Sequence, residues 1–157
     1  MNPARPPGSG RPRLGLLLAA LAATGVAVAA YLTIRKVGGE SAVCVIGGGC
    51  ETVDASAYSV ILGIPTAAFG VAWSTVALVA ALAWWWTADH RPLLVLYLGG
   101  LVATIAEAYL VYLELFVIRA VCSWCVLYGA TVVIGWLGAV VGLRWAGRGE
   151  ADVEPPD

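Results

Sequence analysis

Charged residues are scarce in this sequence. Lysine and arginine number 9 and aspartate and glutamate 10 among 157 residues, so 12% of the chain is charged and 61% is hydrophobic. A soluble domain is usually about one quarter charged, so this composition excludes an ordinary water-soluble domain and predicts a membrane protein. The formal net charge of −1 does not decide whether nucleic acid is a partner, but the sequence has no basic patch, so we expect no nucleic-acid partner.

Histidine and cysteine are also rare. The single histidine, His90, lies in the polar stretch 87–91, where we interpret it as a solvated turn residue and not as a catalyst or metal ligand. The four cysteines form two close pairs that are far apart in the sequence: Cys44 with Cys50, and Cys122 with Cys125. An even number of paired cysteines is typical of the oxidising face of a membrane.

Long apolar runs, by contrast, are abundant. Four segments, residues 14–34, 65–86, 92–115 and 122–143, each reach the roughly 20 residues that a transmembrane helix needs. We therefore expect an all-α membrane protein, with one domain over residues 14–143 that forms a four-helix transmembrane bundle. Residues 1–13 and 144–157 are expected to be disordered tails. A cleaved signal peptide is the alternative for the first segment, but that run is longer than a signal core of about 7–15 residues.

The only sizeable loop, residues 35–64, carries the first cysteine pair. Three of the five residues between Cys44 and Cys50 are glycine, so the two sulfurs can close a small disulfide loop or swing apart. Beyond Cys50, Asp54 or Ser56 is a candidate N-cap for a short helix over residues 59–62, which Gly63 would end. We expect this apolar helix to lie on the membrane surface as a lid. A shorter link, residues 116–121, precedes the fourth segment.

Positive charges near the segment ends predict the orientation. One side carries six (Arg5, Arg11, Arg13, Arg91, Arg144 and Arg148) and the other carries three (Arg35, Lys36 and Arg119). The richer side is expected to be cytoplasmic. Both termini of this multi-pass protein would then be cytoplasmic, and both cysteine pairs would lie at the outer face of the cell membrane.

The second cysteine pair opens the fourth segment as Cys122-Ser123-Trp124-Cys125. Two thiols at this spacing lie on one face of a helix start, and the helix N-terminus and Arg119 both favour thiolate. Such a pair fits a redox centre, a structural disulfide or half of a zinc site. A flexible pair that faces a fixed pair indicates a relay by thiol–disulfide exchange, which would end on a lipid-soluble acceptor such as a quinone.

With this combination of residues the chain resembles the bacterial members of the vitamin K epoxide reductase family over about residues 14–143. The matching residues are Cys44-x5-Cys50, Ser56, Leu62-Gly63-Ile64-Pro65 with Phe69-Gly70, and the Cys-x-x-Cys pair that opens the last helix. In the disulfide-bond-protein-B type of oxidase the Cys-x-x-Cys pair lies in the first outside loop, so this cysteine order argues against that type.

The resemblance implies a four-helix bundle around a quinone pocket, for menaquinone or ubiquinone. It implies that Cys125 reacts with the quinone, that Cys122 exchanges with Cys50, and that Cys44 meets the protein partner. That partner is expected to be a separate thioredoxin-fold (DsbA-like) protein, because this chain ends before the fused thioredoxin-like domain that many relatives carry. Ser56 would hydrogen-bond near the site. Tyr128 is the candidate quinone-contacting tyrosine, one position short of its place in the animal enzymes.

Three further side chains are candidates within the apolar segments. Glu107 lies about eight residues inside the third segment, where burying an acid is costly. It would supply a proton route for quinone reduction or a hydrogen bond to the pocket. The alternative is a neutral side chain that hydrogen-bonds to a neighbouring helix. Tyr112 would line the pocket or belong to an interfacial belt. Glu114 is expected to be solvated near the interface. In the second motif, Trp124 would shield the sulfurs or anchor the helix.

The predicted function is an integral-membrane thiol–disulfide oxidoreductase that supports disulfide formation in exported proteins. Three alternatives are left open. With the same residues, the main output could instead be the reduction of a quinone or of a quinone epoxide. The four cysteines could form a zinc site in a protein that is not an enzyme. They could also form structural disulfides that only stabilise a four-helix membrane protein.

Overall fold

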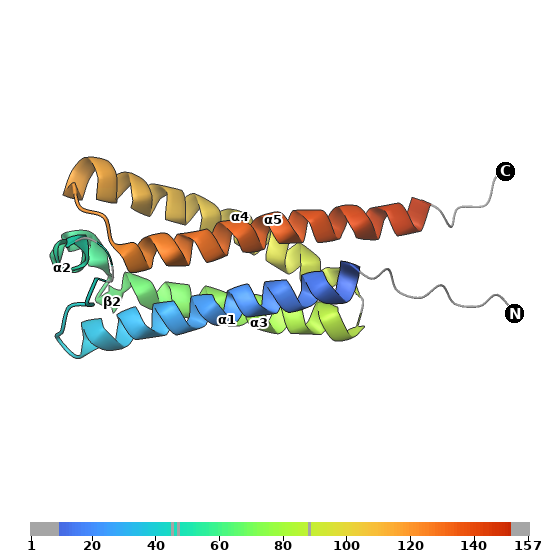
Figure 1. Ribbon diagram of the computed structural model, residues 1–157, viewed down its shortest axis with the longest axis horizontal. Helices are drawn as coiled ribbons and strands as arrows, with labels where there is room; N and C mark the ends of the chain where they lie inside the picture. The colour runs from blue at the N-terminus through green and yellow to red at the C-terminus, as the bar shows by residue number, and fades with distance from the viewer. Residues whose placement is uncertain (1–9, 45, 47, 88, 152–157) are drawn as a thin grey trace, which may run out of the picture.

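Four long helices run side by side and form an elongated bundle in the computed structural model (Figure 1), which describes residues 10–44, 46, 48–87 and 89–151. They are α1 (Gly10–Val37), α3 (Thr66–Thr87), α4 (Arg91–Tyr112) and α5 (Ser123–Ala151). Each belongs to a helical stretch that is long and apolar enough to cross a membrane. The prediction of an all-α, four-helix membrane bundle is therefore confirmed.

The helices differ from the expected segments mainly at their ends. Helix α1 begins at Gly10 and α5 continues to Ala151, so residues 10–13 and 144–151, which were expected to be disordered, are helical. After Leu143 the next proline is Pro155, so no proline interrupts the added turns of α5. The rest of the two predicted tails, residues 1–9 and 152–157, lies outside the described residues.

Small and apolar side chains fill the space between the helices. Helix α1 packs against α3 and α5, and α4 packs against α5 and α3. Two clusters of buried residues result. The larger one lies toward the start of α1 and includes Leu18, Ala77, Ala81, Trp84, Leu93 and Ala139. The smaller one lies toward the cysteines and consists of Val28, Ala29, Tyr128 and Val132.

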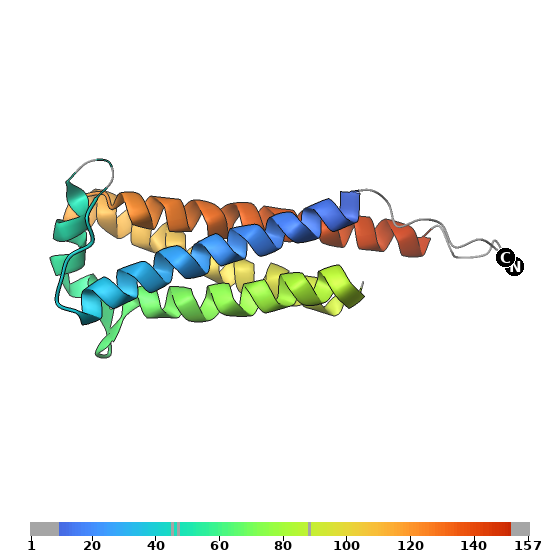
Figure 2. The same ribbon diagram turned by 60° about the horizontal axis from the view of Figure 1, so that its bottom comes forward.

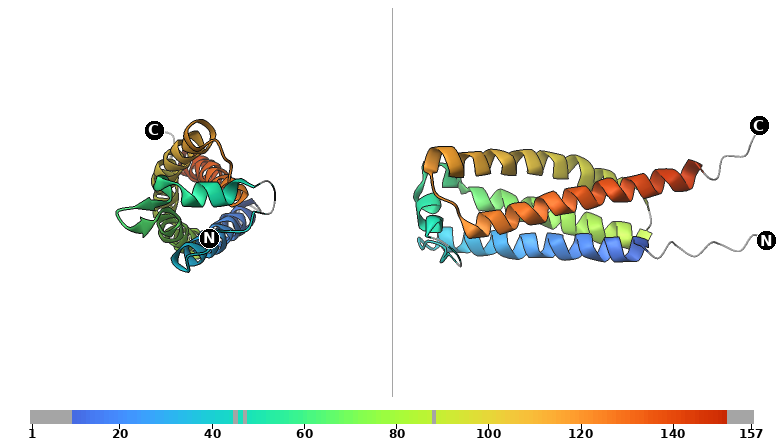
Figure 3. Two further views of the ribbon diagram at one scale, coloured as in Figure 1. Left: turned by 90° about the vertical axis from the view of Figure 1, so that its left-hand side faces the viewer. Right: turned by 45° about the horizontal axis from the view of Figure 1, so that its top comes forward.

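The connection between α1 and α3 covers one end of the bundle. Its short helix α2 (Gly49–Ala55) lies across that end in the left view of Figure 3. A single 3-10 turn, η1 (Ala57–Ser59), follows it. The predicted lid helix is therefore present, but it starts just before Cys50 and not at residue 59. Ser56 ends α2 and precedes η1, but its hydroxyl donates to the Val53 carbonyl at 2.7 Å and makes no capping hydrogen bond to η1.

Residues 60–65, most of which were expected to be helical, form a hairpin instead. Strands β1 (Val60–Ile61) and β2 (Ile64–Pro65) pair antiparallel, with Val60 opposite Pro65. Val60, Ile61 and Ile64 are β-branched, which favours extended backbone. Leu62 and Gly63 have φ values of +52° and +83°, and the type I′ turn common in two-residue hairpins needs a positive φ at both positions.

Helix α4 also continues further than expected. A π-helix, η2 (Leu113–Ile118), extends it and leaves a link of four residues, 119–122, before α5. Arg119 has a φ of +57°, in the left-handed region, and the chain turns back there toward the bundle. Figures 1 and 2 show the start of α1 and the end of α5 at one end of the bundle, and α2 and the hairpin at the other.

Candidate functional site

Both cysteine pairs lie at the end of the bundle that α2 covers. Cys44 and Cys50 are joined by a disulfide, whereas Cys122 and Cys125 are free thiols. The side chains at the centre of the arrangement are buried, with Cys50 2% and Cys122 3% exposed. The disulfide occupies two of the four sulfurs, which argues against a zinc site made of four thiolates.

A glycine allows α2 to approach the link that precedes α5. A Cβ atom added at Gly49 would come within 2.7 Å of the Val121 backbone nitrogen, and closer still to the Val121 carbonyl oxygen. Backbone atoms cannot rotate away as a side chain can, so only glycine fits at this contact. Because Gly49 precedes Cys50 and Val121 precedes Cys122, this contact holds the two cysteine pairs together.

Replacing Gly49 with alanine should therefore separate the two pairs. In a background with Cys44→Ala and Cys125→Ala, Cys50 and Cys122 are the only thiols left, and mild oxidation with diamide can join them. We expect Gly49→Ala to lower the yield of this disulfide about tenfold or more, because displacements of about 1 Å can cost a hundredfold in rate. The yield is measured by mass spectrometry of the bridged peptides.

Gly48→Ala is the matched control for this experiment. Among the described residues, a Cβ at Gly48 would meet nothing within 4 Å, and the φ of −115° suits any residue. The control should form the Cys50–Cys122 disulfide at the parental yield. Equal yields from the two alanine variants would show that the Gly49 contact does not hold the pairs together.

Trp124 anchors the cysteine loop. Its indole Nε1 donates a hydrogen bond to the Val43 carbonyl at 2.8 Å, one residue before Cys44. Its ring packs on Tyr31 of α1, with the two ring centroids 5.1 Å apart. Of the two roles considered for Trp124, these contacts favour anchoring, and they fix the loop as well as the helix.

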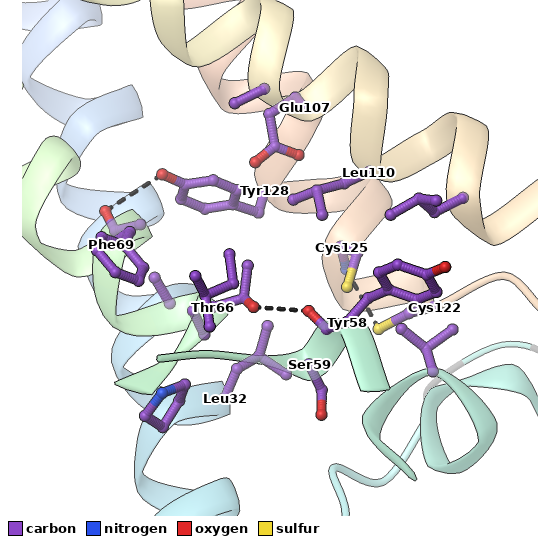
Figure 4. Close-up of a pocket in the computed structure, with 18 of the residues that line it drawn as sticks. Leu32, Tyr58, Ser59, Thr66, Phe69, Glu107, Leu110, Cys122, Cys125 and Tyr128 are labelled. Carbon is purple, nitrogen blue, oxygen red and sulfur yellow. Dashed lines mark hydrogen bonds between the residues drawn. The ribbon is translucent and has the colours of Figure 1, made fainter. Parts of the chain in front are cut away.

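A cavity of about 900 Å³ lies between α2 and the long helices, and Figure 4 shows part of its wall. Three sulfur-bearing residues line it, namely Cys50, Cys122 and Cys125. Cys44 lies outside this lining. Most of the remaining wall is apolar, and includes Leu32, Phe69, Trp73 and Leu110. Its size falls within the range of about 300–1,000 Å³ that is typical of small-molecule sites.

Three of the four additional candidates from the sequence also line this cavity: Ser56, Glu107 and Tyr128. The Tyr128 hydroxyl donates to the Gly70 carbonyl at 3.2 Å and accepts from Ser74 at 3.3 Å. Figure 4 places Glu107 beside the Tyr128 ring. The Glu107 carboxylate lies 3.2 Å from the position that a Cβ atom at Gly129 would occupy. Because Gly129 belongs to α5, Glu107 faces α5 within the bundle.

Tyr112 is the exception, and the structure does not place it at the cavity. Its side chain is 53% exposed and packs on Phe116, with ring centroids 5.1 Å apart. Tyr112 is not among the residues that line the cavity, and its exposed ring fits the other role considered for it, a place in an interfacial aromatic belt.

Glu114 is the cavity residue that sequence reasoning misjudged. It was expected to be solvated, yet it is only 4% exposed. Its Oε2 accepts a hydrogen bond from the Cys122 backbone N–H at 3.2 Å, and its carbonyl accepts one from Ala120 at 3.0 Å. The reversal of the chain at Arg119 makes both contacts possible. Glu114 therefore holds the start of the Cys-x-x-Cys motif from the preceding helix.

The Cys122 thiol ionises more readily than an ordinary cysteine. The hydrogen bond from the Cys125 side chain lowers the pKa of the Cys122 thiol to about 7, and this effect outweighs burial, which raises it. The backbone N–H groups of Cys125 and Trp124 also lower this pKa. Arg119, which was expected to help, is not among the causes. Near neutral pH a large fraction of Cys122 is therefore thiolate, the nucleophilic form.

The rate of Cys122 modification should follow this ionisation. With methyl methanethiosulfonate, we expect the rate to rise with pH around a midpoint near 7 and then level off, because only the thiolate reacts. Cys125→Ala removes the largest cause and should move the midpoint up toward the ordinary value of 9.0. Mass spectrometry of the Cys122 peptide measures the rate. A midpoint that stays near 7 in Cys125→Ala would refute this cause.

The comparison with known families agrees with this geometry. Residues 16–140 match the profile described as the vitamin K epoxide reductase family, a range that contains all four cysteines and every cavity residue described above. The matched range also spans most of each long helix. The chain therefore belongs to the vitamin K epoxide reductase family.

Proposed function

We propose that this protein is an integral-membrane thiol–disulfide oxidoreductase that passes electrons from a separate thioredoxin-fold (DsbA-like) protein to a quinone. Its output would be disulfide formation in exported proteins. The observation that carries the proposal is the arrangement of the sulfurs. The loop disulfide is held against the Cys-x-x-Cys pair, and the latter lines a largely apolar cavity.

Each cysteine has a distinct task in this relay. A thiolate of the partner attacks Cys44, which is less buried than Cys50, and Cys50 leaves as a thiolate. The second thiol of the partner then releases Cys44. Cys50 attacks the oxidised Cys122–Cys125 pair at Cys122, and Cys44 closes back on Cys50. Cys122 is a good leaving group in that last step because its pKa is about 7.

The cavity suits the acceptor. A bound quinone supplies the chemistry of accepting two electrons and two protons. The apolar wall would hold its ring and lipid tail, while Cys125 would face its reactive carbon atoms. Ser56, Glu107 and Tyr128 would be the polar groups around the ring, with Glu107 as a proton source or hydrogen-bond partner.

The same proposal includes an orientation. The end that carries the cysteines would face outward, and both termini would be cytoplasmic, because the opposite end carries more arginine. Two of the three positive charges at the cysteine end are paired with acids. Arg35 lies 2.7 Å from Glu40, and Lys36 lies 3.3 Å from Asp54.

Purified protein in nanodiscs tests the function directly. With dithiothreitol as electron donor, we expect consumption of a menaquinone or ubiquinone analogue that depends on enzyme concentration, with one disulfide formed per quinone. A quinone epoxide is supplied in parallel, since the family description favours it as a second candidate. Consumption of the epoxide alone would make epoxide reduction the main output. Consumption of neither would overturn the proposal.

A further inference from the structure

The hydroxyl of Ser123 lies against both sulfurs of the loop disulfide. Its Oγ is 3.8 Å from the Cys50 Sγ and 3.7 Å from the Cys44 Sγ. These sulfurs are 73 and 79 positions away in the sequence, so the fold alone brings the three groups together. Ser123 is the first residue of α5, and the backbone there is held by the adjacent contact between Cys122 and Glu114.

The two sulfurs differ in their other hydrogen-bond donors. The Cys44 Sγ also accepts a hydrogen bond from the Cys50 backbone N–H, at 3.1 Å. For the Cys50 Sγ, the described part of the chain provides Ser123 as its hydrogen-bond partner and no other. A thiolate formed at Cys50 would therefore depend on the Ser123 hydroxyl for stabilisation.

Cleavage of a disulfide releases one sulfur as a thiolate, and the reaction is faster when that thiolate is stabilised. A disulfide sulfur is a weak acceptor, whereas a hydrogen bond to a charged group is considerably stronger. A hydroxyl beside the leaving sulfur thus gains strength as negative charge develops there. Such an interaction stabilises the transition state more than the ground state, which is the condition for catalysis.

We propose that Ser123 is a catalytic residue of thiol–disulfide exchange, which deepens the proposed function and rests on its order of steps. When a partner thiolate attacks Cys44, a bond forms between the partner sulfur and the Cys44 Sγ, and the Cys44–Cys50 bond breaks. The electron pair of that bond remains on Cys50. Ser123 keeps its proton and donates a hydrogen bond to the new Cys50 thiolate.

The test measures how fast the loop disulfide opens, without quinone or protein partner. In a Cys122→Ala, Cys125→Ala background only the Cys44–Cys50 disulfide is left, and dithiothreitol reduces it under pseudo-first-order conditions. Trapping with a maleimide and mass spectrometry gives the rate. We expect Ser123→Ala to slow reduction about tenfold, which is the effect of losing one hydrogen bond to a developing charge.

Two further variants separate chemistry from structure. Ser123→Thr keeps a hydroxyl and should restore the rate to within about twofold. Ser41→Ala removes a serine hydroxyl from the same loop that is not among the hydrogen-bond partners of the two sulfurs in the described part of the chain, and it should leave the rate unchanged. An unchanged rate in Ser123→Ala, or a failure of threonine to restore it, overturns the proposal. No quinone enters this assay, so its result is independent of the quinone assay. A negative quinone assay would reject the proposed function, whereas the role of Ser123 is decided by the reduction rates alone.

Discussion

Cys125→Ala is expected to reduce quinone consumption by the purified protein to the uncatalysed background, and Cys122→Ala is expected to do the same. The two electrons leave this pair as a disulfide forms between its sulfurs, and a single sulfur cannot complete that step. Both thiols line the cavity where the acceptor would bind. The rate is followed as loss of quinone absorbance with dithiothreitol as donor.

Folding has to be separated from chemistry in this experiment. Val126→Ala is a suitable control, because Val126 follows Cys125 on α5 and its side chain is half exposed to the surroundings of the bundle. It should retain most of the activity. Circular dichroism should give the same helix content for all three variants. Substantial quinone consumption in both cysteine variants would mean that the Cys122–Cys125 pair is not the direct electron donor to the quinone.

Cys50→Ala should stop electron entry from the protein donor but not from dithiothreitol. We expect it to abolish oxidation of a reduced DsbA-like protein, because Cys50 is the member of the loop pair that lines the cavity together with Cys122. With dithiothreitol, which is small enough to reduce Cys122–Cys125 directly, quinone consumption should stay within about threefold of the parent. The ratio of the two rates should thus fall by at least about a hundredfold.

Cys44→Ala helps to interpret that ratio. It also removes the loop disulfide but leaves the Cys50 thiol beside Ser123, so it should block the protein donor and spare dithiothreitol as well. Loss of activity with dithiothreitol in Cys50→Ala alone would mean that every donor enters through Cys50. The proposed order, from the loop pair to the helix pair, would then be wrong.

The main lines of this fold could be predicted because they depend on composition and local pattern. Four long apolar runs in a chain with so little charge predict a bundle of membrane helices. In lipid the backbone N–H and C=O groups need hydrogen-bond partners, and a helix provides them within each segment. Two cysteine pairs separated by an even number of crossings must lie at the same end. That count predicts only a shared end, and it was the family resemblance that implied the meeting of Cys50 with Cys122, both of which line the cavity.

The errors concern contacts between segments that are distant in sequence. Gly49 was one of several glycines that indicated only a flexible loop, and its need for glycine arises from the backbone of Val121. Glu114 is buried because the chain reverses at Arg119, and its carboxylate meets the Cys122 amide there. The proposed role of Ser123 depends on two sulfurs that lie more than 70 residues away in the sequence. Hydrophobic periodicity contains no information of this kind.

The hairpin is a different kind of error, because its signal is local. Val60-Ile61 and Ile64-Pro65 flank a two-residue turn that ends in glycine, which is the pattern of a β-hairpin. The apolar character of the stretch favoured a helix in the sequence reading. The β-branched residues and the positive φ values at Leu62 and Gly63 outweighed it.

The position of α2 across the bundle end has a consequence for steady-state kinetics. Cys44 lies outside the cavity lining, whereas Cys50, at the start of α2, is part of it. In the proposed relay, the protein donor and the lipid-soluble acceptor would therefore occupy separate sites and never compete for one. Such an enzyme follows a two-site ping-pong scheme, in which an excess of either substrate does not inhibit turnover of the other.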